Sequence, residues 1–205
     1  MRTGEYRFDL SGGHMALDLA NTVSGREDPE RRNDHLGSSA DLLAFASQSG
    51  IVSAGEAAEL RVWARQHEAE ARRSFRKVVG LREAVYAAFS AVAQGRMAGL
   101  DSLDAINHAA LEALQHRRLS PARGGYRWQW LPAAKNPLER VLWLIAQSAA
   151  DLLTSEELKI VRFCEAPDCQ WLFLDHSRNR SRRWCDMTTC GNRQKARRHY
   201  RRTHR

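Results

Sequence analysis

The four cysteines of this 205-residue chain lie close together, in the order Cys164-x4-Cys169-x15-Cys185-x4-Cys190. Two closely spaced pairs separated by a loop can place four thiolates around one tetrahedral Zn²⁺ ion. Four thiolates complete the coordination shell, so the pattern predicts one structural Zn²⁺ and not a catalytic metal. Metal binding would supply most of the folding free energy of so small a module. Cys164–Cys169 and Cys185–Cys190 disulfides, or a redox-switched zinc site, are the alternatives.

The residues around the first cysteine pair favour a β-hairpin. Extended segments lead into Cys164 and away from Cys169, and Pro167 lies in the turn between them. We expect the hairpin tip to contribute two ligands, and the second pair to close the site with Cys190 at the mouth of the final helix, where the helix dipole favours a thiolate. The spacing is typical of a treble-clef or a ribbon-like finger and does not separate the two.

The positive charge of the chain is concentrated at its C-terminal end. The whole chain carries a net charge of +8. Residues 176–205 contain ten Arg and one Lys against one acid, Asp186, whereas the rest has 21 Lys and Arg against 23 Asp and Glu. A basic segment attached to a metal site is typical of a surface that binds nucleic acid. A disordered basic tail that only aids solubility is the alternative.

The final segment reads as a basic helix. On a helical wheel of about 100° per residue that starts at Arg193, the cations from Lys195 to Arg205 form one broad face. We expect the weakly apolar side, with Ala196, His199 and Tyr200, to dock on the zinc site. The loop between the cysteine pairs adds further donors suited to phosphate. The candidate DNA contacts are Arg178, Asn179, Arg180, Arg182, Arg183, Asn192, Arg193, Lys195, Arg197, Arg198, Arg201 and Arg202.

Among these candidates, Arg193, Arg197 and Asn192 are the first choices for base contacts. Arg and Asn side chains are suited to this role because both can make bidentate hydrogen bonds to base edges. The alternative for the whole helix is a solvated basic face without a partner. For Asn192 the alternative is that it braces the zinc site through backbone hydrogen bonds.

Residues 1–155 are predicted to form a mostly helical domain. Apolar residues recur at helical spacing over residues 81–92, 103–114 and 138–153, the last after Asn136-Pro137, a cap and first-turn proline. A shorter helix is expected after Ser38 or Ser39, and the composition of residues 56–77 predicts another. Residues 126–131 alternate aromatic and polar side chains and are expected to pair with residues 117–120 as a hairpin.

The helical periodicity stops at Thr154–Glu157, which divides the chain into residues 1–155 and residues 156–205. The predicted fold class is therefore mainly α with minor β (α+β). It comprises a helical N-terminal domain with a small β-hairpin, followed by a C-terminal four-cysteine zinc module that ends in a basic helix.

A second binding site is a hypothesis for the N-terminal domain. Asp18 and Asn21 lie near Gly12-Gly13, and with Arg82 they are candidates to bind a small effector. The alternative is that Asp18 and Asn21 are buried and brace a helix end or a neighbouring loop. No catalytic triad, phosphate loop or paired-carboxylate motif is recognisable, so we do not expect an enzyme.

The sequence also predicts where the protein is found. No apolar run approaches the roughly 18 residues of a membrane span, and the start of the chain lacks the apolar stretch of a secretory signal. We therefore expect a cytoplasmic, nucleoid-associated protein without a membrane partner, in a compartment where paired cysteines hold metal more often than they form disulfides.

The C-terminal segment contains the tetrapeptide Cys190-Gly-Asn-Arg193, which follows a Ser-Arg-Asn run and the sequence Arg-Arg-Trp-Cys185. With these motifs it resembles the CGNR zinc-finger family of bacterial transcription regulators, which is named after the tetrapeptide. Residues 12–22, 38–45 and 81–86 resemble the ABATE domain, the stress-induced transcription regulator-like companion of this finger. The resemblance implies Zn²⁺ on the four cysteines, DNA binding by the basic end and a sensory or regulatory role for residues 1–155.

We therefore predict a DNA-binding transcription regulator with a structural zinc finger and a sensory N-terminal domain. A small-molecule effector and a homodimer are further hypotheses, the latter because regulators commonly bind symmetric half-sites. One alternative is an RNA- or ribosome-associated zinc-binding factor. Another is a small-molecule enzyme whose zinc finger is only structural.

Overall fold

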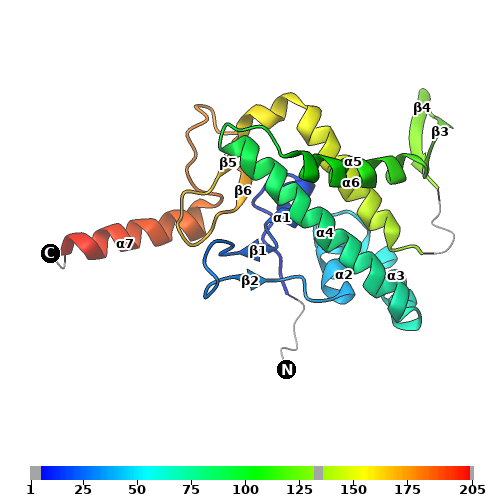
Figure 1. Ribbon diagram of the computed structural model, residues 1–205, viewed down its shortest axis with the longest axis horizontal. Coiled ribbons are helices and arrows are strands. Elements are labelled where there is room, and N and C mark those ends of the chain that lie inside the picture. The colour runs from blue at the N-terminus through cyan, green and yellow to red at the C-terminus, as the bar shows by residue number, and fades with distance from the viewer. Residues whose placement is uncertain (1–5, 132–135, 204–205) are drawn as a thin grey trace.

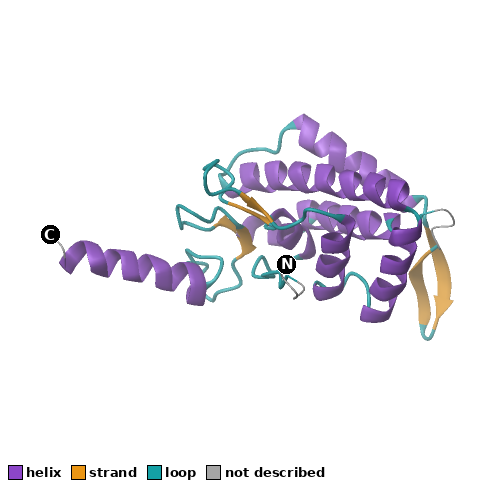
Figure 2. Ribbon diagram, turned by 90° about the horizontal axis from the view of Figure 1, so that it is seen from below, coloured by secondary structure: helices purple, strands orange, loops and turns teal. Residues whose placement is uncertain are grey.

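The computed structural model describes residues 6–131 and 136–203. Figure 1 shows a helical body from which one long helix projects at one end and a β-hairpin at the other, and Figure 2 shows the same arrangement from below. The fold is mainly α with minor β, as predicted. The helices are α1 (Met15–Ala20), α2 (Ser39–Gln48), α3 (Ala54–Gln66), α4 (Glu68–Ala93), α5 (Leu100–Leu114), α6 (Glu139–Thr154) and α7 (Asn192–Thr203).

Among the described residues, the strands form three separate antiparallel hairpins. Two short helical turns, η1 (Glu156–Ile160) and η2 (Met187–Gly191), flank the last of these hairpins in the chain. The strands are β1 (Val23–Ser24) and β2 (Asn33–Asp34), β3 (Arg117–Ala122) and β4 (Gly125–Trp130), and β5 (Val161–Phe163) and β6 (Leu172–Leu174).

Local signals in the sequence account for several of these elements. The Ser38 hydroxyl accepts the backbone N–H of Asp41 at 3.2 Å and caps α2. The side-chain oxygen of Asn136 accepts the N–H of Leu138 at 3.2 Å, just before α6. The predicted β3–β4 hairpin is confirmed, with Leu119 opposite Trp128. The predicted helices over residues 103–114 and 138–153 are confirmed as α5 and α6.

The prediction of one helix over residues 56–77 is wrong, because α3 ends at Gln66 and α4 begins at Glu68. Between them His67 takes φ −131° and ψ 57°, outside helical geometry. Its ring stacks on Trp63 with centroids 4.6 Å apart. The helix that follows is 26 residues long and includes the apolar series of residues 81–92. The break lies in a run of good helix formers, so composition did not reveal it.

The main hydrophobic core brings together side chains from α1, α2, α4, α5 and α6. α6 contributes six of its seven buried residues to this core, among them Val141, Ile145 and Ala149. Val161, Leu172 and Leu174 of the β5–β6 hairpin belong to the same core. Apolar packing therefore continues past Ser155, and the two segments share one core. The division into residues 1–155 and residues 156–205 stays a proposal, which concerns the separate functions of the two segments. No helix within the described ranges is long and apolar enough to cross a membrane.

Candidate metal centre and nucleic-acid interface

The side chains of the four cysteines converge on one point. All four are buried, and their Sγ atoms lie within 4.8 Å of one another. The Sγ atom of Cys185 is 3.6 Å from that of Cys169 and 3.7 Å from that of Cys190. A tetrahedron with Zn–S bonds of about 2.3 Å has edges of about 3.8 Å, so these spacings fit one zinc ion. They are too long for disulfides, and all four cysteines are free thiols.

The first cysteine pair lies at the tip of the β5–β6 hairpin, as predicted. Phe163 pairs with Leu172 at the end of the ladder. Beyond it, the N–H of Cys164 donates to the carbonyl of Trp171 at 2.8 Å, and the N–H of Cys169 donates to Ala166 at 3.0 Å. Gln170 takes φ 60° and turns the chain back into β6. The hairpin thus holds both thiols by backbone hydrogen bonds.

Of the second cysteine pair, Cys185 precedes the helical turn η2 and Cys190 lies within it. Asp186 caps this turn by accepting the N–H of Thr189 at 2.7 Å. A Cβ atom at Gly191 would lie 2.5 Å from Met187 Sδ and 3.2 Å from Trp184 Cδ1, so a larger residue directly after Cys190 would displace the Met187 side chain. Cys190 lies just before α7, as predicted. Because this pair comes from a helical turn and not from a second hairpin, the arrangement is the treble-clef-like one.

Electrostatics at the cluster favour a bound cation. Hydrogen bonds from the other three cysteines, and then the charge of Arg193, lower the pKa of the Cys190 thiol. Hydrogen bonds from Cys169 and Cys185 lower the pKa of Cys164 to about 7. Hydrogen bonding within the cluster instead raises the pKa of Cys169. Four adjacent thiols do not all ionise by themselves because like charges repel, and a central Zn²⁺ removes that repulsion.

Asp168, between the first two cysteines, holds α7 against the metal centre. Its carboxylate lies 3.1 Å from Arg197 Nη2 and 3.4 Å from Arg193 Nε. Arg193 Nη2 also donates to Cys190 Sγ at 3.2 Å. The two arginines that were our first choices for base contacts therefore brace the helix on the zinc centre. Asn192, the other choice, is exposed at the start of α7.

Beyond these contacts, α7 extends into solvent. None of the residues Asn192–Thr203 is buried, and Tyr200 is 63% exposed. Figure 1 and Figure 2 both show the helix projecting from the body. The prediction that its weakly apolar side docks on the zinc site is wrong, because the metal centre and Asp168 hold only the first turns. Arg205, predicted on the basic face, lies outside the described residues.

The predicted DNA contacts divide into two groups. Four arginines have internal partners. Arg182 donates to the carbonyls of Trp184 and Cys185, Arg183 donates to Glu165 at 2.6 Å, and Arg193 and Arg197 pair with Asp168. The other cations make no side-chain hydrogen bond or ion pair with any described residue, and Asn179 is exposed beside them. These unpaired cations are Arg178, Arg180, Lys195, Arg198, Arg201 and Arg202.

A buried carboxylate orders the loop that carries Arg178 and Arg180. Asp175 is 1% exposed and accepts the N–H of Ser177 at 3.0 Å and the N–H of Arg182 at 2.9 Å. Sequence reasoning missed both Asp175 and Asp168. The signal that could have found them is an isolated acid beside a zinc ligand or at the start of a basic loop.

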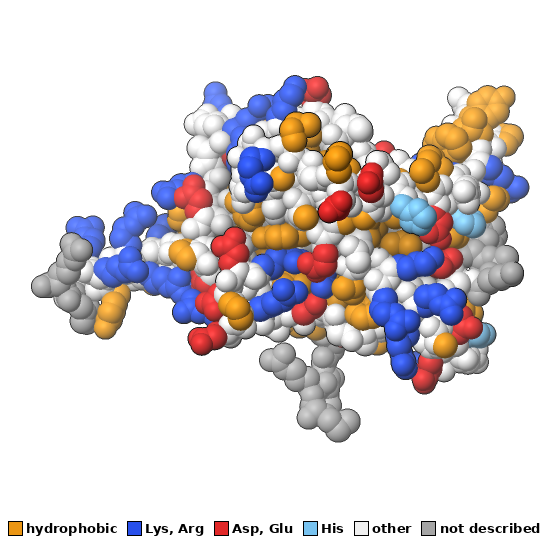
Figure 3. All heavy atoms as spheres, in the orientation of Figure 1, with side chains coloured by type: hydrophobic (Ala, Val, Ile, Leu, Met, Phe, Trp, Pro, Cys, Tyr) orange, Lys and Arg blue, Asp and Glu red, His pale blue; other side chains and the backbone are white. Residues whose placement is uncertain are grey.

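A groove runs between α7 and the preceding loop. It consists of two clefts of about 380 and 390 Å³ that share Arg183, Trp184, Gln194 and Arg198 as lining residues. Lys195 lines the first cleft, and Arg201 and Arg202 line the second. Figure 3 shows Lys and Arg side chains gathered over this end of the molecule. The unpaired cations of α7 therefore face a continuous basic groove.

Asp18 and Asn21, two of the candidate effector residues, brace the zinc hairpin. The Asn21 amide donates to the carbonyl of Leu172 at 2.8 Å and accepts its N–H at 2.9 Å. Asp18 accepts the N–H of Gly12 at 2.8 Å, and the carbonyl of Gly12 accepts the N–H of Leu174 at 3.0 Å. A Cβ atom at Gly12 would lie 2.7 Å from Asp18 Oδ1, so this close approach needs glycine. The contacts match the alternative that these side chains brace a neighbouring segment.

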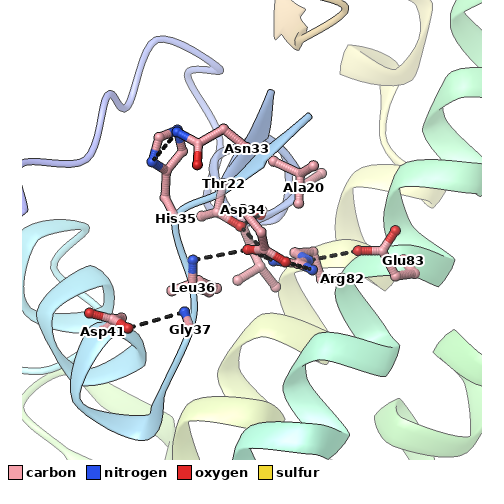
Figure 4. Close-up of polar contacts among 12 residues, drawn as sticks. Ala20, Thr22, Asn33, Asp34, His35, Leu36, Gly37, Asp41, Arg82 and Glu83 are labelled. Atoms are coloured by element: carbon pink, nitrogen blue, oxygen red, sulfur yellow. Dashed lines mark hydrogen bonds and ion pairs between the residues drawn. The ribbon is translucent and has the colours of Figure 1, made fainter. Parts of the chain in front are cut away.

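Arg82, the third candidate, has a different set of partners. Its two terminal nitrogens each lie 2.7 Å from a carboxylate oxygen of Asp34, and its Nε donates to Glu83 at 2.8 Å. Figure 4 shows this network, in which the buried Arg82 ties the β1–β2 hairpin to α4 through the more exposed Asp34. The structure thus brings Asp18 and Asn21 together around Gly12 and gives Arg82 a separate structural role.

A helical body joined to a four-cysteine centre that carries a basic helix defines the class of zinc-finger proteins with a helical N-terminal domain. Residues 13–156 match the ABATE family, described as "Putative stress-induced transcription regulator". Residues 161–203 match the CGNR zinc finger. The chain belongs to the ABATE family, and its four cysteines form the site of one structural Zn²⁺. No curated protein matches this chain.

Proposed function

We propose that this protein is a DNA-binding transcription regulator in which the zinc centre presents α7 and the Arg178–Trp184 loop to the DNA backbone. The family description supports a regulatory role. The observation that carries the proposal is that α7 buries none of its residues while four of its cations lack a partner among the described residues. Like charges held this close repel one another, and a polyanion relieves that repulsion.

The geometry of α7 suits a nucleic-acid groove. Its 12 residues span about 18 Å at 1.5 Å per residue, and a B-DNA major groove about 12 Å wide admits one helix. On the helical wheel, Lys195, Arg198 and Arg202 fall within an arc of about 60° on the side away from Arg193. Asp168 holds the Arg193 side against the zinc centre, and the free arc lines the groove between α7 and the preceding loop.

Phosphate contacts by these cations would supply most of the affinity and make it depend steeply on salt. We expect the double substitution Arg198→Ala and Arg202→Ala to weaken binding to a 20-base-pair duplex by about 10- to 100-fold at low salt. The slope of log affinity against log salt should fall by about two, because two phosphate contacts are lost. Fluorescence anisotropy of a labelled duplex, at several salt concentrations, measures both quantities.

A matched control removes the same charge elsewhere. Arg123 and Arg127 lie exposed on the β3–β4 hairpin, and their replacement by Ala should leave affinity and slope unchanged. Equal losses in both double variants, or no loss at Arg198 and Arg202, would reject this interface. Competition between duplex DNA and structured RNA of the same length at equal salt tests which of the two nucleic acids the protein prefers. Preference for RNA would replace the proposal with an RNA-associated factor.

A further inference from the structure

A cleft of about 610 Å³ lies between α2, α3 and the start of α4, at the end of the body away from α7 (Figure 1). Four guanidinium groups line it, from Arg61 and Arg65 of α3 and from Arg72 and Arg76 of α4. One carboxylate, that of Glu68, lines it with them. Figure 3 shows Lys and Arg side chains gathered over this end of the molecule. The cleft is therefore strongly cationic.

The arginines are placed by helical spacing. Within each helix the two lining arginines are four residues apart and so share one face, an arrangement in which like charges destabilise a helix. Arg65, Arg72 and Arg76 make no side-chain hydrogen bond or ion pair with residues 6–131 or 136–203. Internal contacts thus leave the mutual repulsion of Arg72 and Arg76 uncompensated and Arg65 unpaired among the described residues, and a bound anion would compensate these charges.

The other walls of the cleft add specificity. Ser38, which caps α2, and Ser39 and Ala40 of its first turn line one side with small side chains, while the carboxylate of Asp41 already accepts hydrogen bonds from Gly37 and Ser38 at this helix N-terminus. Leu43, which is buried, and Phe75, which is partly buried, give the cleft an apolar side. A ligand that fits both parts carries an anionic group and an apolar portion.

We propose that this cleft binds a small organic anion, with a phosphate or carboxylate held between the arginines of α3 and α4 and an apolar portion placed against Phe75. Guanidinium groups bind both kinds of anion with paired hydrogen bonds. The cleft is distinct from Asp18, Asn21 and Arg82, whose polar groups are occupied by internal partners. It is also distinct from the groove beside α7.

The test uses the full-length, zinc-loaded protein and two probes, phenyl phosphate and inorganic phosphate, in calorimetric titrations at constant ionic strength. We expect saturable binding of phenyl phosphate that is several-fold tighter than that of inorganic phosphate, because the phenyl ring adds apolar contact. Arg72→Glu should weaken phenyl phosphate binding at least tenfold. Arg73→Glu is the matched control, because Arg73 is exposed on the same helix but does not line the cleft.

Absence of saturable binding in the unmodified protein would overturn the proposal, as would equal weakening by both substitutions. Loss of phenyl phosphate binding in the Arg198→Ala, Arg202→Ala variant, with Arg72→Glu unaffected, would assign the anion to the α7 groove and overturn it as well. If Arg72→Glu instead lowers DNA affinity as much as that double variant, the cleft belongs to a nucleic-acid surface and the proposal fails. Circular dichroism and zinc content check folding, and Arg76→Ala provides a second variant of the same site.

Discussion

The helices α6 and α7 are fixed to the molecule in opposite ways. α6 buries seven side chains, six of them in the main core, whereas α7 buries none. Burial of apolar surface holds α6. The zinc centre and the carboxylate of Asp168 hold α7 at its first turns. A helix fixed by metal and ion pairs leaves its sides available for a partner, so the comparison separates the part that makes the fold from the part that presents charge.

Removing the metal should give the largest effect, because it should release α7 and leave α6 in place. We expect chelation of zinc, or Cys185→Ser, to unfold the cysteine cluster and release α7, because structural zinc in small fingers contributes on the order of 10 kcal/mol. Helices α1–α6 should keep their structure, since the cysteines form a cluster separate from the main core. Limited proteolysis should cut residues 176–203 and spare the body. Cooperative loss of the whole fold would contradict this separation.

Asn21 joins the helical body to the β5–β6 hairpin of the zinc module, so its substitution should have the next largest effect. Asn21→Ala leaves the buried N–H and carbonyl of Leu172 without partners, which we expect to lower the free energy of unfolding by about 3 kcal/mol. Urea denaturation followed by circular dichroism measures the change. Asn107→Ala, at an exposed position of α5, is the control and should change stability by less than about 0.5 kcal/mol. Equal changes in the free energy of unfolding for the two variants would show that the Asn21–Leu172 hydrogen bonds contribute nothing to stability.

Asp18 makes the stability of this contact between the helical body and the β5–β6 hairpin sensitive to pH. Burial raises its pKa to about 7, against hydrogen bonds from Gly12 and Gly13 that lower it. Between about pH 4 and pH 7 the folded protein retains a proton that the unfolded chain has lost, so this group's contribution to stability falls as pH rises. From pH 4.5 to pH 8 we expect the stability of Asp18→Asn, relative to that of the unmodified protein, to rise by about 3 kcal/mol. Urea titrations at the two pH values would contradict this if the difference between the proteins stayed constant.

The sequence revealed the parts of this molecule that rest on local spacing. The zinc ligands follow from cysteine intervals, and α6 follows from the apolar period of residues 138–153. Contacts between distant segments were not visible in this way. The pairing of Asn21 with Leu172 joins residues 151 positions apart, and that of Asp168 with Arg197 joins residues 29 positions apart. Charge pattern alone could not show which arginines would be used internally.

Asp168→Asn tests whether the pose of α7 contributes to binding, and its effect should be the smallest. The two arginines that it contacts are more than 40% exposed, so we expect a loss of less than about 1 kcal/mol in stability. The substitution also removes a negative charge beside the proposed interface, which by electrostatics alone would tighten DNA binding. If the carboxylate fixes the helix, affinity should instead fall by about two- to threefold, because an unrestrained helix loses more entropy on binding.

Glu165→Gln is the matched control for this prediction, since it removes one negative charge from the pair with Arg183 without touching α7. It should tighten binding slightly, and its salt slope should match that of the unmodified protein. Anisotropy titrations of both variants with the same duplex give the comparison. If Asp168→Asn tightens binding as much as Glu165→Gln does, the charge of α7 contributes to affinity and its orientation does not. The different ways in which α6 and α7 are held would then affect stability alone.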